Sequence, residues 1–212
     1  MVLVPQTQST ILVLLSQQVN DLAVIEQSLV VWTIRISLLM MFVSLLLRIL
    51  QKPTSAELGG VDQKKIEQSL AAELGQHSWL LGSLFSLLHL IVTMLMVHGG
   101  SHTVAMAHTA DQSEAMIGIR AGWGLYFNYA FVIIWLIDAL WWIGLPTSFR
   151  RRSVWLNGAV IGFLIFVAFN GAVVFAQGPI RWISLAMFAV LAILFLVSTR
   201  RSTDHEPSEN LT

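Results

Sequence analysis

Three histidines and two acids gather in one short stretch of the sequence, His98, His102, His108, Asp111 and Glu114. Imidazole and carboxylate groups four residues apart can meet on one helical turn, and this mixture of ligands suits zinc, copper, iron or manganese. His102 and His108 are six residues apart, however, which places them on different faces of a straight helix, and neither a His-Glu-x-x-His nor a Glu-x-x-His motif is present. Two interpretations therefore stay open: a metal site made by His98, His102, His108 and Asp111, or a polar surface network without metal.

The composition narrows the choice of cofactor further. The chain has no cysteine, which excludes disulfides, thiolate zinc sites, iron–sulfur clusters and covalent attachment of haem. A haem held by two histidines would need His89 together with a histidine nearer the surface, because no second histidine lies deep in an apolar run. We therefore predict no resident cofactor, with one transition metal (Zn, Cu, Fe or Mn) as the alternative and haem disfavoured.

The polar residues within the long apolar runs include Arg35, His89, Asp138 and Asn170. A charge at membrane depth costs about 2.5 to 3.5 kcal/mol, so such groups normally face the protein and find a partner. Asp138 could pair with Arg35 or with an indole such as that of Trp142, or it could act as a carboxylate in a proton relay.

His89 shares one predicted helical face with small and hydroxylated residues. Gly82, Ser86, His89 and Thr93 follow one another at steps of four, three and four residues, so His89 is expected to point toward other helices. It could handle protons or bind a cofactor, or it could be a neutral histidine that forms hydrogen bonds across helices.

Five apolar runs are long enough to hold these residues within a membrane. A spanning helix needs about 20 apolar residues, because the hydrocarbon layer is about 30 Å thick and each residue rises about 1.5 Å. The predicted spans cover residues 28–49, 79–97, 124–144, 154–175 and 180–197. Gly158 and Gly162 in the fourth span have the spacing that lets helices pack closely in lipid.

The positions of the basic residues predict the orientation of the spans. Short cytoplasmic connections retain an excess of Lys and Arg, and most of the twelve basic residues fall at alternate ends of the runs. We therefore expect the N-terminus outside and the C-terminus inside. Trp79 and Trp142 would then lie near inner span ends, at the headgroup level that indole rings prefer. The basic residues at these inner ends are Arg48, Lys52, Lys64, Lys65, Arg150, Arg151, Arg152, Arg200 and Arg201.

Four segments outside the spans complete the organisation. Helical periodicity predicts an amphipathic helix over 9–26 that packs on the outer surface or extends the first span, and a short inner helix over 61–74 that stops at Gly75. The histidine-containing connection covers 98–123. The polar tail, 199–212, is too poor in apolar residues to fold alone and is expected to be disordered.

Composition supports a single membrane domain over residues 1–198. Of 212 residues, 56% are hydrophobic and 11% charged, whereas soluble domains usually carry about a quarter charged residues. The fold class is therefore an all-α, five-span transmembrane helix bundle in contact with the lipid bilayer. The net charge is zero, which gives no reason to expect a nucleic-acid partner.

Several strings together resemble small polytopic bacterial membrane proteins that have no assigned activity. They are Ser101-His102, Ala107 to Ala110, Gly124 to Tyr129, Trp135 to Trp142, Phe169-Asn170-Gly171 and Gly178 to Trp182. The resemblance implies a multi-pass protein of the bacterial inner (cytoplasmic) membrane and supplies no activity.

The sequence gives no recognisable catalytic motif, nucleotide-binding loop or internal repeat. We therefore expect an accessory or scaffolding membrane subunit, without enzymatic activity, that packs with other membrane subunits or with itself as a homo-oligomer. The alternative is a metal-binding membrane protein or metal-dependent membrane enzyme with its site on the outer face.

Overall fold

The computed structural model describes the backbone of residues 6–51 and 61–203, and the side chains of residues 15–51 and 70–200. Within these ranges the chain is helical and has no strand. The described residues contain five helices long and apolar enough to cross a membrane, which confirms the predicted class of helix bundle. These helices cover Leu15–Leu50, Leu70–Val97, Gly124–Gly144, Val154–Val174 and Pro179–Arg200.

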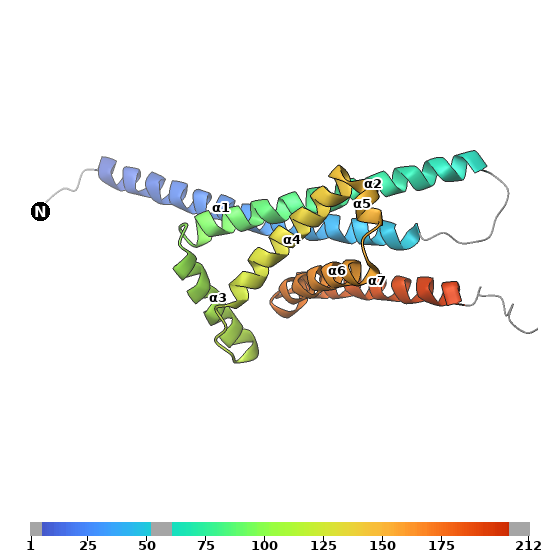
Figure 1. The fold of residues 1–212 in the computed structure, drawn as a ribbon. Coiled ribbons are helices and arrows are strands. Elements are labelled where there is room, and N and C mark those ends of the chain that lie inside the picture. The colour runs from blue at the N-terminus through green and yellow to red at the C-terminus, as the bar shows by residue number, and fades with distance from the viewer. Residues whose placement is uncertain (1–5, 52–60, 204–212) are drawn as a thin grey trace, which may run out of the picture.

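The first two spans belong to helices longer than predicted. Helix α1 covers Gln6–Leu50, and α2 covers Val61–Val92 and continues as the π-helix η1, Thr93–Val97. The two run antiparallel and side by side (Figure 1). The segments 9–26 and 61–74 are therefore not separate helices, and the predicted stop at Gly75 is wrong. Glycine costs a helix interior only about 1 kcal/mol relative to alanine, which the packing of α2 on α1 can offset.

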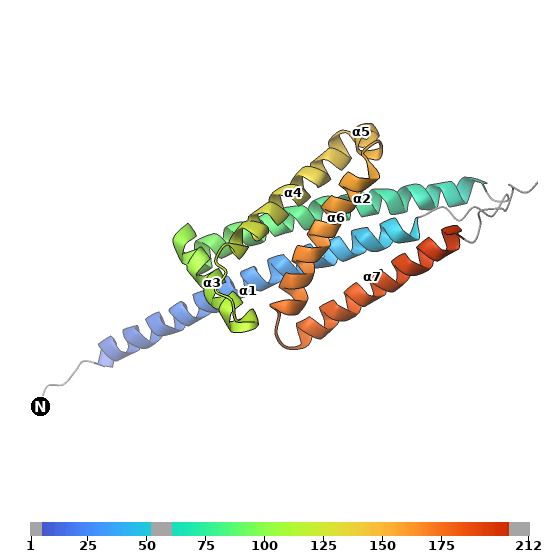
Figure 2. The same cartoon turned by 60° about the horizontal axis from the view of Figure 1, so that its bottom comes forward.

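The remaining elements build on this pair. They are α3 (His102–Ile117), α4 (Gly124–Gly144), α5 (Pro146–Arg150), α6 (Val154–Phe169), the π-helix η2 (Asn170–Val174) and α7 (Pro179–Thr203). In Figure 2, α1 lies between α2 and α7, while α4 and α6 run obliquely to them. Helix α4 packs on α2, and α6 packs on α4. Helix α7 is longer than its predicted span, so disorder is wrong for 199–203, and the rest of the tail lies outside the described residues.

The two ends of the bundle differ chemically. We call the end that holds Arg48, Arg152 and α5 the basic end, and the end that holds His98 and α3 the histidine end. Helix α3 turns away from the bundle at the histidine end, and the first part of α1 extends beyond the other elements there (Figures 1 and 2).

Small polar side chains join α1 to α2. The Ser37 hydroxyl donates to the Gly82 carbonyl at 2.9 Å, and the Ser44 hydroxyl donates to the Gly75 carbonyl at 2.7 Å. Each pair lies seven residues from the other on both helices, which is the repeat of an antiparallel coiled-coil seam. Because small residues let backbones approach closely in lipid, this seam fixes the register of the two longest helices.

The apolar core lies where α1, α2, α4 and α6 meet, with one residue from α7, and two indoles are fully buried in it. Trp79 and Trp135 are both 0% exposed, and their ring centroids are 5.3 Å apart. Gly82 lies against the Trp135 ring, because a Cβ atom at this position would come within 2.6 Å of Cζ2. The glycine therefore makes room for the indole.

Gly158 and Gly162 do not form the close helix contact that their spacing predicted. A Cβ atom built at either position meets no other atom within 4 Å, apart from its own helix backbone and chain neighbours. The contacts of this span come instead from its other face, where Leu164, Ala168 and Ala172 are buried. In the chain as described, the Gly158–Gly162 face is therefore open.

Candidate functional site

The predicted histidine cluster begins at a turn between η1 and α3. Gly99 and Gly100 take positive φ angles of 57° and 73°, which glycine adopts without strain, and Ser101 caps α3 through its side chain. The turn brings His98 against His108, with ring centroids 5.3 Å apart. His98 is 8% exposed, whereas His108 is exposed.

The other members of the cluster contact Tyr129 or Arg120 instead of the histidine pair. His102 Nδ1 lies 3.1 Å from the Tyr129 hydroxyl on α4. Asp111 and Glu114 both pair with Arg120, at 2.6 and 3.0 Å. The structure therefore splits the cluster into a histidine pair, a histidine–tyrosine pair and an exposed ion triad.

This division does not bring the predicted metal ligands His98, His102, His108 and Asp111 together. Among the described residues, no group of three or more His, Asp or Glu side chains is arranged to hold a metal ion. A site built on His98 and His108 would have only two protein ligands, whereas zinc sites in proteins normally have at least three.

The contact between His98 and His108 predicts a pH effect. Burial lowers the pKa of His98 below its ordinary value of 6.5, and the neighbouring His108 lowers it further. Folding therefore favours neutral His98, so its stabilising contribution is present above pH 6.5 and is lost as the pH falls below that value. We expect NMR titration of His98 in detergent micelles to give a pKa below 6.5. The His108→Gln variant should raise that pKa without restoring it fully, because burial is the larger cause.

The matched control for this titration is His102→Gln, which removes a histidine that contacts Tyr126 and Tyr129 instead. It should leave the pKa of His98 unchanged. A His98 pKa at or above 6.5 in the unmodified chain would contradict the burial of this ring.

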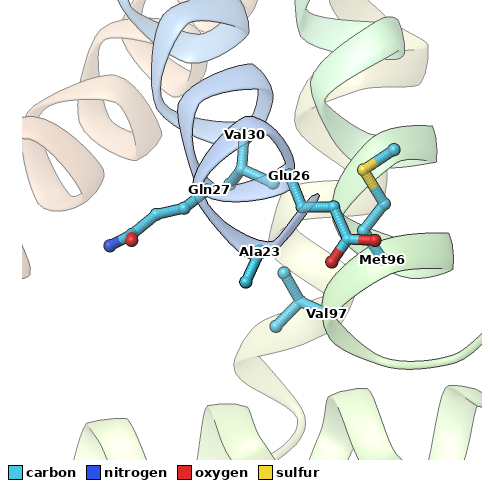
Figure 3. A pocket seen from close by; sticks show the side chains of 6 residues that line it. All are labelled: Ala23, Glu26, Gln27, Val30, Met96 and Val97. Carbon is cyan, nitrogen blue, oxygen red and sulfur yellow. The ribbon is translucent and has the colours of Figure 1, made fainter. Parts of the chain in front are cut away.

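A small pocket lies between α1 and η1 at the histidine end (Figure 3). Its volume is about 210 Å³, below the roughly 300 to 1,000 Å³ of typical ligand pockets. Glu26 is its only acidic lining residue, and its other lining residues are Ala23, Gln27, Val30, Met96 and Val97. This combination gives little basis for binding a polar substrate.

His89 faces α1, as the spacing on α2 predicted. Its Nδ1 donates to the Val30 carbonyl at 3.0 Å and lies 3.3 Å from the Thr33 hydroxyl. Gly82 and Ser86, on the same face of α2, are buried. His89 therefore joins α2 to α1 near the histidine end, in the way expected of a histidine that forms hydrogen bonds across helices.

Arg35 and Asn170 make local contacts. Arg35 is exposed, and its guanidinium lies 5.3 Å from the ring of Trp32, one turn closer to the histidine end. This geometry suits an arginine that extends its charge toward a membrane surface. Asn170 donates to the Phe166 carbonyl of its own helix at 2.7 Å, where α6 gives way to η2.

Asp138 lies at the basic end and does not pair with Arg35. Its carboxylate accepts hydrogen bonds from the guanidinium of Arg152 and, at 2.8 Å, from the indole of Trp79. The aspartate and arginine side chains are only 3% and 4% exposed. The predicted indole partner, Trp142, is therefore replaced by Trp79, and the pair joins α2 and α4 to the turn before α6. Arg152 also donates to Asn157.

A second arginine completes this basic cluster. The guanidinium of Arg48 lies 4.3 Å from the ring of Trp79 and 4.0 Å from that of Trp142. Phe149 of α5 stacks on Trp142, with centroids 5.4 Å apart and planes within 7°. We call Arg48, Trp79, Asp138, Trp142, Phe149 and Arg152 the basic-end cluster.

Sequence reasoning used Arg48 and Arg152 only to orient the chain and missed their buried contacts. Both follow long apolar runs, where a cytoplasmic position is the ordinary expectation. The available signal was the tryptophans at the same level, since indole faces attract guanidinium groups.

Comparison of the chain with protein-family models, with curated proteins and with solved structures gives no significant match.

Proposed function

We propose that this chain is a non-catalytic membrane subunit that packs against other membrane proteins or against copies of itself. The observation that carries the proposal is an apolar stripe on α1 that begins where the helix extends beyond the bundle and continues beside η1 and the end of α2. We call this surface the α1 stripe. Its members are exposed and lie on one helical face: Leu15, Leu22, Ile25, Leu29 and Trp32.

The length of α1 explains why the stripe calls for a partner. Its 45 residues make a helix about 68 Å long, more than twice the thickness of the hydrocarbon layer. With the basic end of α1 at one membrane surface, roughly half of the helix lies beyond the opposite side of the hydrocarbon layer. Apolar side chains in a stripe are stabilised there when another apolar surface covers them.

The polar residues support a structural role. His89 joins α2 to α1, and the Asp138–Arg152 pair joins α4 to the turn before α6. These are the residues that an intramembrane reaction or proton path would use, and in this fold they hold helices together. Only 6% of the most apolar stretch of α7 is buried against other described residues, which leaves that helix available to lipid or to a partner.

The proposal includes a location in the inner membrane of a bacterium, with the basic end in the cytoplasm. Arg150 and Arg151 are exposed at that end, and an excess of such residues is retained on the cytoplasmic side.

The orientation can be tested by cysteine labelling, because the sequence has no cysteine of its own. A cysteine at Ser148 should react with an impermeant thiol reagent only in inverted vesicles, and one at Thr103 only in intact cells. The reverse pattern would overturn the orientation.

The test of function is extraction of the full chain in native nanodiscs, followed by measurement of its mass and its bound proteins. We expect a homo-oligomer or a partner in fixed ratio, which Leu22→Asp with Ile25→Asp should release. The matched control is Asn20→Asp with Val24→Asp, which adds the same charge on the opposite face of α1 and should leave the assembly intact. A monomer without bound protein, or equal effects of the two double variants, would refute the proposal.

A further inference from the structure

The last turn of α1 carries hydrogen-bond donors without acceptors. Arg48 Nε and Nη2, and Gln51 Nε2, are fully buried and have no hydrogen-bond partner among the described residues. The two residues lie three apart, on one side of the chain as it leaves α1. A buried donor without an acceptor costs about 1 to 3 kcal/mol, and more when it is charged. In native proteins such a group calls for an explanation, and a bound water or ion is one of them.

Among the residues that the structure describes, the charges around Arg48 do not balance. Asp138 is bound to Arg152, and both groups lie within electrostatic range of Arg48. Two guanidinium groups therefore share one carboxylate, which leaves one positive charge in excess. Because an unpaired charge is costly away from water, the cluster is suited to a second anion.

The aromatic rings decide which part of the guanidinium can bind. The Arg48 guanidinium carbon lies over the rings of Trp79 and Trp142, 4.3 and 4.0 Å from their centroids, and guanidinium groups stack on aromatic faces. Its N–H groups point out along the edge of the plane. A guanidinium edge matches the paired oxygens of phosphate, and bidentate contacts of this kind are among the strongest in proteins.

The position of Arg48 suggests the source of that phosphate. It lies two residues before the end of α1, at Leu50, where the apolar span also ends. Lipid headgroups occupy this level of a membrane, and basic sites between transmembrane helices bind anionic headgroups. We propose that Arg48 and Gln51 bind the phosphate of an anionic phospholipid, with Trp79 and Trp142 holding the guanidinium in place.

The experiment measures retention of phosphatidylglycerol by the full chain, using native mass spectrometry and thermal unfolding in detergent. Phosphatidylglycerol should bind the unmodified chain and raise its Tm, and phosphatidylcholine should do so much less. Arg48→Gln should weaken binding of phosphatidylglycerol about tenfold or more, because charge-assisted hydrogen bonds are lost. Arg48→Lys should weaken binding less, since lysine keeps the positive charge but lacks the paired N–H groups of the guanidinium. Arg151→Gln removes an equal charge from an exposed position at the same end and should have little effect.

Four results would overturn the proposal. Equal weakening by Arg48→Gln and Arg151→Gln would mean a general surface attraction. Stabilisation by inorganic phosphate that matches the lipid effect and depends on Arg48 would assign the site to free phosphate. Loss of a bound protein in Arg48→Gln, with lipid retention unchanged, would assign it to a partner's carboxylate. Glu57 lies outside the described residues. If Glu57→Gln abolished the effect of Arg48→Gln on lipid binding, the acceptor for Arg48 would belong to the chain itself.

Discussion

Replacing Asp138 with asparagine is expected to lower the free energy of unfolding by about 3 to 5 kcal/mol, because it removes one partner of a buried ion pair. Asparagine keeps the shape of the side chain and can still accept from the Trp79 indole. It cannot balance the charge of Arg152, which is 4% exposed, or that of Arg48 beside it. Two like charges would then remain in a site covered by aromatic rings.

An exposed aspartate provides the matched control. Asp111 pairs with Arg120 as Asp138 pairs with Arg152, but both side chains are more than half exposed. Surface pairs are typically worth less than about 1 kcal/mol, so Asp111→Asn should have a small effect. Unfolding of both variants can be followed by circular dichroism in detergent. Equal losses for the two substitutions would show that the pair at Asp138 is not buried in the folded protein.

The spans illustrate what the sequence can predict. The third span matches residues 124–144 at both ends, and the fourth and fifth match to within three residues, because Pro, Gly or charge bounds each apolar run. The first two spans were predicted too short. Hydropathy detects where a helix becomes apolar, whereas α1 and α2 continue through amphipathic segments that contain no proline.

The site residues were harder to predict, because spacing along one helix does not reveal what lies across from it. His89 could be placed correctly, since its own helix carries the pattern of small residues that faces α1. The partner of Asp138 could not, because Arg152 comes from a turn after α5 that the apolar runs do not position. The division of the histidine cluster could not be predicted either, because the spacing does not reveal that Arg120 of the same connection pairs with Asp111.

The second large effect on stability is expected from a substitution at Gly82 in α2. Gly82→Ala is expected to destabilise the bundle by about 1 to 3 kcal/mol, the usual cost of overpacking a core. The new methyl group would lie 2.6 and 2.8 Å from two carbons of the Trp135 ring, and 3.2 Å from Met40 Cβ. Trp135 is 0% exposed, so its ring has no open space into which to move. The clash should outweigh the gain of about 0.5 to 1 kcal/mol that alanine brings to a helix interior.

Gly162→Ala separates these two contributions, because it makes the same chemical change where no atom within 4 Å would clash. In detergent-solubilised monomer it should therefore stabilise the chain by about 0.5 to 1 kcal/mol, the helix gain alone. Opposite signs for the two variants would confirm that Gly82 is a packing residue and that the Gly162 face is open. A similar loss for both would mean that another surface covers α6, and comparison of monomer with assembly would then show whether that surface belongs to a partner.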